Sequence, residues 1–257
     1  MELWNKKDIP LYLENEEIPQ ITPYIAENSK ACVVICPGGG YQHRAPHEGE
    51  GYAKWLNENG VSAFVVDYRV APYKYPAPQY DAMRAIRYAR FYAKKYGYCE
   101  DKIGIMGSSA GGHLAGSVAT ATDEMGYTPV DEIDTVSSRP DFMVLCYPVI
   151  SLVEFTHHGS RMNLMGEVSE REAQKLSNDK RVTKDTPKAF IWHTAEDQAV
   201  PVENSLMLAK ALSEKRVPFE LHCYQNGPHG LGLAPETKGT KEWGNALLKW
   251  LEINDLK

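Results

Sequence analysis

Six short apolar runs of strand length recur along the chain and set the first expectation about its fold. They lie at 31–36, 62–67, 103–106, 142–147, 189–194 and 219–224. Most of them are continuously apolar instead of alternating with polar residues. Such runs are typical of parallel strands buried on both faces, so the pattern predicts a mostly parallel sheet.

Segments with helical periodicity separate these runs. Tyr52, Trp55 and Leu56 form one face of a helix predicted over 48–59. Further helices are expected over 79–96, from Ser109 onward, over 202–215 and over 241–253, and Gly97 ends the first of these. Strands alternating with helices predict an α/β fold with helices on both faces of the sheet. Because no linker interrupts the 257 residues, we expect one domain over 1–257.

The segment 151–186 breaks this alternation. Ser169 with Glu172 three residues later has the pattern of a capping box, which predicts a short helix from that point. Its place between two strands fits a small cap over the edge of the sheet. A long surface connection is the other interpretation, and the sequence leaves both open.

The charge and composition of the chain narrow the classes of function. The chain has 28 Lys and Arg against 34 Asp and Glu, a formal net charge of −6, and no basic block, so we expect no nucleic-acid partner. No apolar stretch approaches the roughly 18 residues of a membrane span, so no membrane partner is expected either. The first 17 residues are polar and acidic, unlike a secretory signal, which predicts a cytoplasmic protein.

The most informative stretch is Gly107-Ser108-Ser109-Ala110-Gly111, between a predicted strand and a predicted helix. It fits the pattern G-x-S-x-G with Ser109 at its centre. In a nucleophile elbow, the serine occupies a strained turn, and its neighbours two positions away must be small because the backbones approach closely. Ser109 is therefore the candidate nucleophile. The flanks of Ser108 do not fit this spacing, so Ser108 is expected to be a supporting residue.

A serine nucleophile needs a base, and the base needs an orienting acid. Asp197 follows the strand at 189–194, and His229 follows the strand at 219–224, so both belong at the carboxyl edge of the sheet, where ligands bind. The chain order Ser109, Asp197, His229 is the order found in α/β-hydrolases. Glu196 is the immediate rival of Asp197.

The other histidines and the cysteines suggest no second chemistry. His113 follows the elbow and is expected to pack on its helix, while His157 and His158 are adjacent and lack a metal-ligand spacing. We expect no metal ion. Cys32 and Cys36 lie four residues apart in one predicted strand, roughly 13 Å, too far for a disulfide, so reduced thiols are expected.

A glycine-rich loop supplies the remaining part of a hydrolase site. Gly38, Gly39 and Gly40 follow the first strand, so backbone N–H groups can approach a bound carbonyl oxygen there. The amides of Gly39, Gly40 and Ala110 are the candidate oxyanion hole. The loop is a weaker candidate for a phosphate cradle, because no Gly-Lys-Ser/Thr follows.

Together, these motifs resemble the acetyl-xylan-esterase-like group of α/β-hydrolase esterases, which is related to the hormone-sensitive-lipase type. The matching stretches are PGGGY (37–41), HEGEGYAKWLNENG (47–60), DYRVAP (67–72), YPAPQYDAMRAIRY (75–88), GSSAGGHLA (107–115), WHTAEDQAVPVENS (192–205) and GPHGLGLA (227–234). Lipase-like relatives usually begin the glycine loop with His-Gly-Gly, whereas this chain has Pro37 there. This difference favours the acetyl-esterase branch.

The resemblance implies a serine esterase that removes acetyl or other short acyl groups from sugars or xylan-type oligosaccharides, with no cofactor. Tyr41, His47, Glu48 and Trp192 are candidate substrate contacts, although packing is the alternative for the aromatic residues. The residues alone indicate only acyl transfer to water. An amide or formamide hydrolase, a small peptidase and a non-catalytic binding protein with this fold stay open as alternatives.

Overall fold

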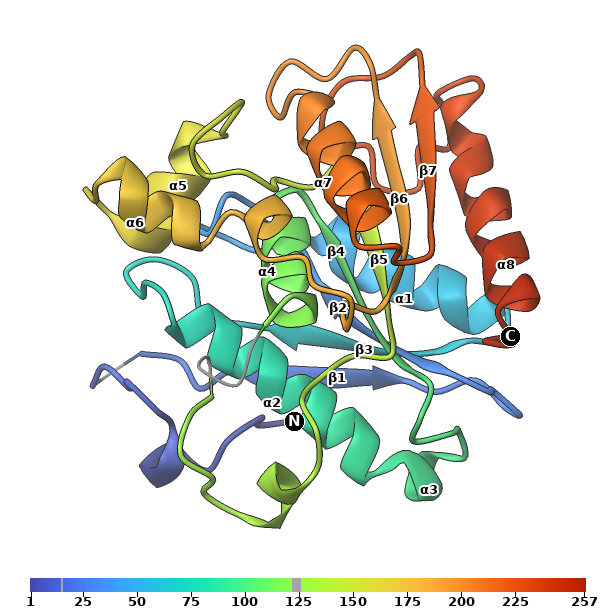
Figure 1. Cartoon of the computed structure of the whole chain (residues 1–257). Coiled ribbons are helices and arrows are strands. Elements are labelled where there is room, and N and C mark those ends of the chain that lie inside the picture. Colours follow the sequence, from blue (N-terminus) through green and yellow to red (C-terminus); the bar gives the residue numbers. More distant parts are fainter. Residues whose placement is uncertain (15, 122–125) are drawn as a thin grey trace.

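The computed structural model describes residues 1–14, 16–121 and 126–257, and a seven-stranded sheet runs through them (Figure 1). The strand order is β1-β3-β2-β4-β5-β6-β7. All neighbours from β3 to β7 are parallel, as the apolar runs predict. Their bounds are β2 Cys32–Cys36, β3 Ser62–Asp67, β4 Ile103–Ser108, β5 Phe142–Cys146, β6 Lys188–Thr194 and β7 Phe219–Tyr224.

One strand is additional to the predicted set. β1 (Gln20–Tyr24) pairs antiparallel with β3 at the edge of the sheet, with Ile21 opposite Val66. Only Ile21 is buried in β1, and Pro23 interrupts its pattern, so the segment contains no apolar run. The prediction missed it because an edge strand needs little burial and tolerates proline.

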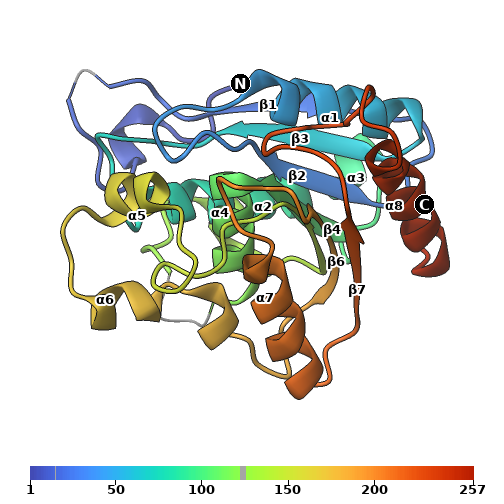
Figure 2. The same cartoon turned by 90° about the horizontal axis from the view of Figure 1, so that it is seen from above.

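Helices cover both faces of the sheet (Figures 1 and 2). α1 (Pro46–Glu58) and α8 (Trp243–Ile253) pack on one face, in a core that includes Trp192 and Trp243. α2 (Ala77–Phe91), α4 (Ser109–Ala119) and α7 (Glu203–Glu214) pack on the other face, in a larger core. The helix predicted over 79–96 is divided, because α2 ends at Phe91 and the short α3 (Ala93–Tyr96) follows before left-handed Gly97.

The segment 151–186 contains two short α-helices, α5 (His158–Met165) and α6 (Glu170–Lys175). The capping box of Ser169 and Glu172 is present at the start of α6. Asn163 of α5 donates a hydrogen bond to the carbonyl of Gly40 at 2.8 Å, so this segment rests on the glycine loop. A cap function for it stays a prediction.

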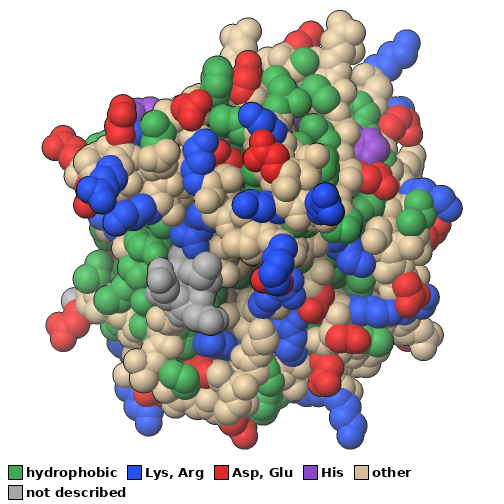
Figure 3. Space-filling view, in the orientation of Figure 1, with side chains coloured by type: hydrophobic (Ala, Val, Ile, Leu, Met, Phe, Trp, Pro, Cys, Tyr) green, Lys and Arg blue, Asp and Glu red, His purple; other side chains and the backbone are tan. Residues whose placement is uncertain are grey.

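Acidic and basic side chains are interspersed on the face drawn in Figure 3. The five cysteines are all free. Within the described part of the chain, no helix is both long and apolar enough to cross a membrane.

Candidate active site

Ser109 sits in a strained turn between β4 and α4. It is the first residue of α4 and has a φ of +54°, in the left-handed region that L residues rarely adopt. A Cβ added at Gly107 would overlap the carbonyl of Gly111, and one added at Gly111 would overlap the carbonyl of Cys36. The two glycines are therefore a steric requirement of this turn, as the spacing predicts.

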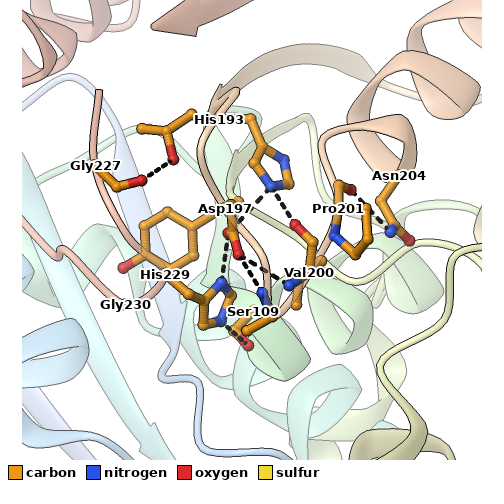
Figure 4. Close-up of polar contacts among 12 residues, drawn as sticks. Ser109, His193, Asp197, Val200, Pro201, Asn204, Gly227, His229 and Gly230 are labelled. Atoms are coloured by element: carbon orange, nitrogen blue, oxygen red, sulfur yellow. Dashed lines mark hydrogen bonds and ion pairs between the residues drawn. The ribbon is translucent and has the colours of Figure 1, made fainter. Parts of the chain in front are cut away.

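Three side chains form a continuous hydrogen-bonded series at the carboxyl edge of the sheet (Figure 4). The hydroxyl of Ser109 lies 2.8 Å from Nε2 of His229. Nδ1 of the same ring lies 2.6 Å from Oδ2 of Asp197. The three residues predicted from separate stretches of the sequence are thus brought together in the predicted order.

Asp197 is buried, and its surroundings favour the carboxylate form. Burial alone would raise its pKa, but hydrogen bonds from His193 and His229, with the charge on His229, hold the pKa well below the usual carboxyl range. Its Oδ1 accepts from the backbone N–H groups of Ala199 and Val200, at 3.0 and 2.9 Å. Glu196, the rival candidate, is exposed and accepts from the N–H of Gly227 instead.

His193 is a site residue that the sequence analysis missed. It is fully buried, and its Nε2 lies 2.9 Å from the carbonyl of Val200 and 3.3 Å from Oδ2 of Asp197. Its Nδ1 lies 2.8 Å from the hydroxyl of Ser205. The Nε2–H thus holds both the carboxylate and its loop. Its position four residues before Asp197, at the end of a strand, was the available signal.

The glycine loop lies directly beside Ser109. Gly39 and Gly40 have φ values of +128° and +65°, which glycine adopts readily. A Cβ added at Gly38 would lie 3.1 Å from the Cβ of Ser109. Ala110 is in the first turn of α4, where backbone N–H groups have no partner within the helix. The predicted oxyanion donors therefore come from two elements that meet at the serine.

Glu48 lies beneath the glycine loop. Its side chain is 3% exposed, Oε2 accepts from the N–H of Gly38 at 2.8 Å, and Oε1 accepts from the hydroxyl of Tyr147 at 2.7 Å. Tyr147 also accepts from the N–H of Gly232 at 2.9 Å and packs edge-on against the His229 ring, with centroids 5.1 Å apart. These contacts make Glu48 a support of the loops around the site, not a substrate contact.

The other candidate substrate contacts differ in exposure. Tyr41 is fully buried and donates to Nδ1 of His113 at 2.8 Å, while Trp192 is fully buried and stacked on Trp243. The contacts of these two rings fit the alternative interpretation, which is packing in the protein interior. His47 is exposed at the rim, and its Nε2 donates to the carbonyl of Gly230, next to His229, at 2.9 Å.

The geometry provides a hydroxyl, a base that can take its proton, an ionised acid that orients the base, and backbone donors alongside. This arrangement is suited to nucleophilic acyl transfer. No group of three or more potential metal ligands occurs among the residues that the structure describes. The parallel sheet with helices on both faces and a strained serine turn after a central strand define the protein as an α/β-hydrolase.

Comparison with known proteins then places the chain within this class. The sequence profile of the BD-FAE family matches residues 21–212, and the chain belongs to that family. It is also 30% identical over 260 residues to the acetylxylan esterase of Xylanibacter ruminicola, a match that covers 98% of this chain. The resemblance that the motifs indicate is thereby confirmed.

Two further relatives bear on the substrate. The endo-1,4-beta-xylanase B of Butyrivibrio fibrisolvens is 36% identical over 239 residues, or 90% of this chain. The chain spans only 38% of that protein and 52% of the acetylxylan esterase. The crystal structure of an acetyl ester-xyloside bifunctional hydrolase from Caldicellulosiruptor lactoaceticus has a TM-score of 0.95 and 48% identity, covering 100% of this chain and 96% of that one.

Proposed function

We propose that the protein is a serine carboxylic ester hydrolase that removes short acyl groups, acetyl above all, from xylan-type sugars. The observation that carries the proposal is the series from Ser109 through His229 to Asp197, with contacts of 2.8 and 2.6 Å. The acetyl and xylan parts of the proposal rest on the similarity to an acetylxylan esterase and to an acetyl ester-xyloside hydrolase.

In this mechanism, the Oγ of Ser109 attacks the ester carbonyl carbon while Nε2 of His229 takes the hydroxyl proton. Asp197 holds the imidazole orientation and stabilises the imidazolium. The amides of Gly39, Gly40 and Ala110 bind the oxyanion, and loss of one such donor typically costs about 2.7–4 kcal/mol. The bond to the alcohol oxygen then breaks, and the alcohol leaves with the proton from His229.

Water completes the cycle by the reverse route. It gives a proton to Nε2 of His229 as it attacks the acyl carbonyl, and the bond to Ser109 breaks as its Oγ takes that proton back. The products are a carboxylic acid and the free enzyme. The same machinery serves an amide or formamide hydrolase, so relative turnover of acetyl esters and formyl amides distinguishes that alternative.

The test is acetate release from acetylated xylo-oligosaccharides by the wild-type protein and by Ser109→Ala. We expect release from the wild type and a loss of at least about 10³-fold in the variant. The other hydroxyl of the elbow, that of Ser108, is fully buried and lies 3.0 Å from the hydroxyl of Tyr52, so it cannot replace Ser109. p-Nitrophenyl acetate is the control ester.

Ser109-dependent hydrolysis of the control ester alone would retain the mechanism and reject the sugar. No hydrolysis of either ester by the wild type would reject the proposed function, and a non-catalytic binding protein would then be the better interpretation.

A further inference from the structure

His157 lies where the segment 151–186 meets the glycine loop. It caps the N-terminus of α5 and is half-buried. A Cβ added at Gly40 would lie 4.0 Å from Cε1 of His157, so the ring borders the loop that faces Ser109. Asn163, one turn and a half along the same helix, fixes this contact through its bond to the Gly40 carbonyl.

The hydrogen bonds of the ring determine which nitrogen is available. Nδ1 accepts from the backbone N–H of Ser160 at 3.2 Å and lies 2.8 Å from the Ser160 hydroxyl, which is fully buried. Since a backbone N–H can only donate, Nδ1 of the neutral ring carries no proton. The proton is on Nε2, and the cap fixes the direction in which this N–H group points.

The surroundings of His157 favour the neutral form of its ring. Burial lowers the pKa of His157, protonation of His229 would lower it further, and the carboxylate of Asp197 opposes this effect. Because the net effect lowers the pKa, the ring is neutral near pH 7 and is an uncharged hydrogen-bond donor.

The chemistry of an acetylated sugar indicates what this donor would meet. An acetyl group has a single strong acceptor, its carbonyl oxygen, which the glycine loop and Ala110 would bind. Every other hydroxyl and ring oxygen of the substrate belongs to the sugar, which is the leaving alcohol that His229 protonates. With the acetyl carbonyl bound by the glycine loop, a donor that borders this loop at Gly40 has the oxygens of the sugar as its remaining partners.

We propose that His157 is a specificity-determining residue whose Nε2–H donates a hydrogen bond to an oxygen of the sugar that carries the ester. This inference rests on the proposed function and adds a contact that selects sugar esters over esters of simple alcohols. The adjacent His158 is exposed and provides a matched control.

The experiment compares His157→Asn, His158→Asn and wild type on two acetyl esters. Asparagine is a favoured N-cap residue, so His157→Asn keeps an acceptor for the Ser160 N–H while its shorter side chain removes the Nε2–H. On acetylated xylo-oligosaccharides we expect kcat/KM to fall about three- to tenfold, the range of one hydrogen bond. On p-nitrophenyl acetate, whose alcohol has no hydroxyl, we expect a change of less than about twofold by the same reasoning. His158→Asn should match wild type on both.

An equal fall on both esters would overturn the inference, because it would mean that His157 acts on the shared acyl chemistry or on the fold. Unchanged kcat/KM on both esters would overturn it as well. A wild-type protein that hydrolyses only p-nitrophenyl acetate would reject the sugar contact while the esterase mechanism stands. The proposed function is tested separately by the loss of hydrolysis in Ser109→Ala. Failure of the esterase function and failure of the His157 contact are therefore distinguishable.

Discussion

Glu48 is a buried residue that holds the glycine loop at Gly38. Each of its carboxylate oxygens accepts one hydrogen bond, from the N–H of Gly38 and from the hydroxyl of Tyr147. Because Tyr147 also accepts from the N–H of Gly232, one carboxylate links the glycine loop to the loop that carries His229. We infer that this buried side chain sets the alignment of the proposed oxyanion donors with the proposed base.

We therefore expect Glu48→Gln to lower kcat while leaving KM nearly unchanged. Glutamine has one acceptor oxygen where glutamate has two, so one of the two donors loses its partner. A fall in kcat of about tenfold, with KM within about twofold, would correspond to partial loss of oxyanion stabilisation. Steady-state kinetics on p-nitrophenyl acetate measures both constants.

The matched control is Glu50→Gln, on the same helix, where the exposed carboxylate pairs with Lys54. It should be indistinguishable from wild type. If Glu48→Gln raised KM and left kcat intact, a substrate contact would be the better interpretation of Glu48.

At the scale of elements, β4, the elbow and α4 form one steric unit with β2. The start of α4 comes so close to the end of β2 that a side chain at Gly111 has no room beside the carbonyl oxygens of Cys36 and Pro37. These neighbours are backbone atoms and cannot move aside as a flexible side chain can. The small residues of the elbow therefore allow both the turn at Ser109 and the close packing of α4 against the end of β2.

Gly111→Ala and Gly51→Ala should consequently change stability in opposite directions. In Gly111→Ala we expect the free energy of unfolding to fall by at least about 2 kcal/mol, because of the overlap with backbone. Gly51 lies within α1 and has no atom near an added Cβ. Gly51→Ala should therefore raise the free energy of unfolding by about 0.5–1 kcal/mol through the higher helix propensity of alanine. Urea unfolding of both variants measures the difference, and a shift of the same sign in both would contradict the steric argument.

Short stretches of sequence predicted those features of the molecule that depend on neighbouring residues in the chain. The apolar runs gave β2 to β7, and the glycine spacing gave Ser109. β1 was missed because an edge strand buries little, and α5 was missed because its N-cap residue, His157, is not a usual cap residue. The surroundings of Glu48 depend on Tyr147, 99 residues away, a partner that no short stretch of sequence specifies.

At the scale of the whole molecule, His113 joins three regions. Its Nδ1 accepts from Tyr41 of the glycine loop, its Nε2 donates to the carbonyl of Leu176 after α6, and its backbone belongs to α4. The ring is fully buried, and burial lowers its pKa to about 4. The folded protein therefore binds no proton here at a pH where the unfolded chain does.

This difference predicts acid sensitivity of a stated sign. The pKa of His113 is about 6.5 in the unfolded chain and about 4 in the folded protein. As pH falls between these two values, the unfolded chain binds a proton that the folded protein does not bind, so the free energy of unfolding falls by up to about 1.4 kcal/mol per pH unit. His113→Gln lacks this contribution. The stability advantage of wild type over the variant should shrink across this window in urea unfolding, and a constant advantage would count against the assignment.

The series of Ser109, His229 and Asp197 has one more consequence, for synthesis and for assay. Ser109 and His229 are 120 residues apart in the chain, and Asp197 comes from a third strand end. No fragment that stops short of residue 229 contains His229, the proposed base, so a nascent or truncated chain would have an elbow serine with no base to activate it. Under the proposed function, hydrolysis of a chromogenic ester would count only molecules in which strands from the first half and the last quarter of the chain have docked, so it would report the yield of complete folding.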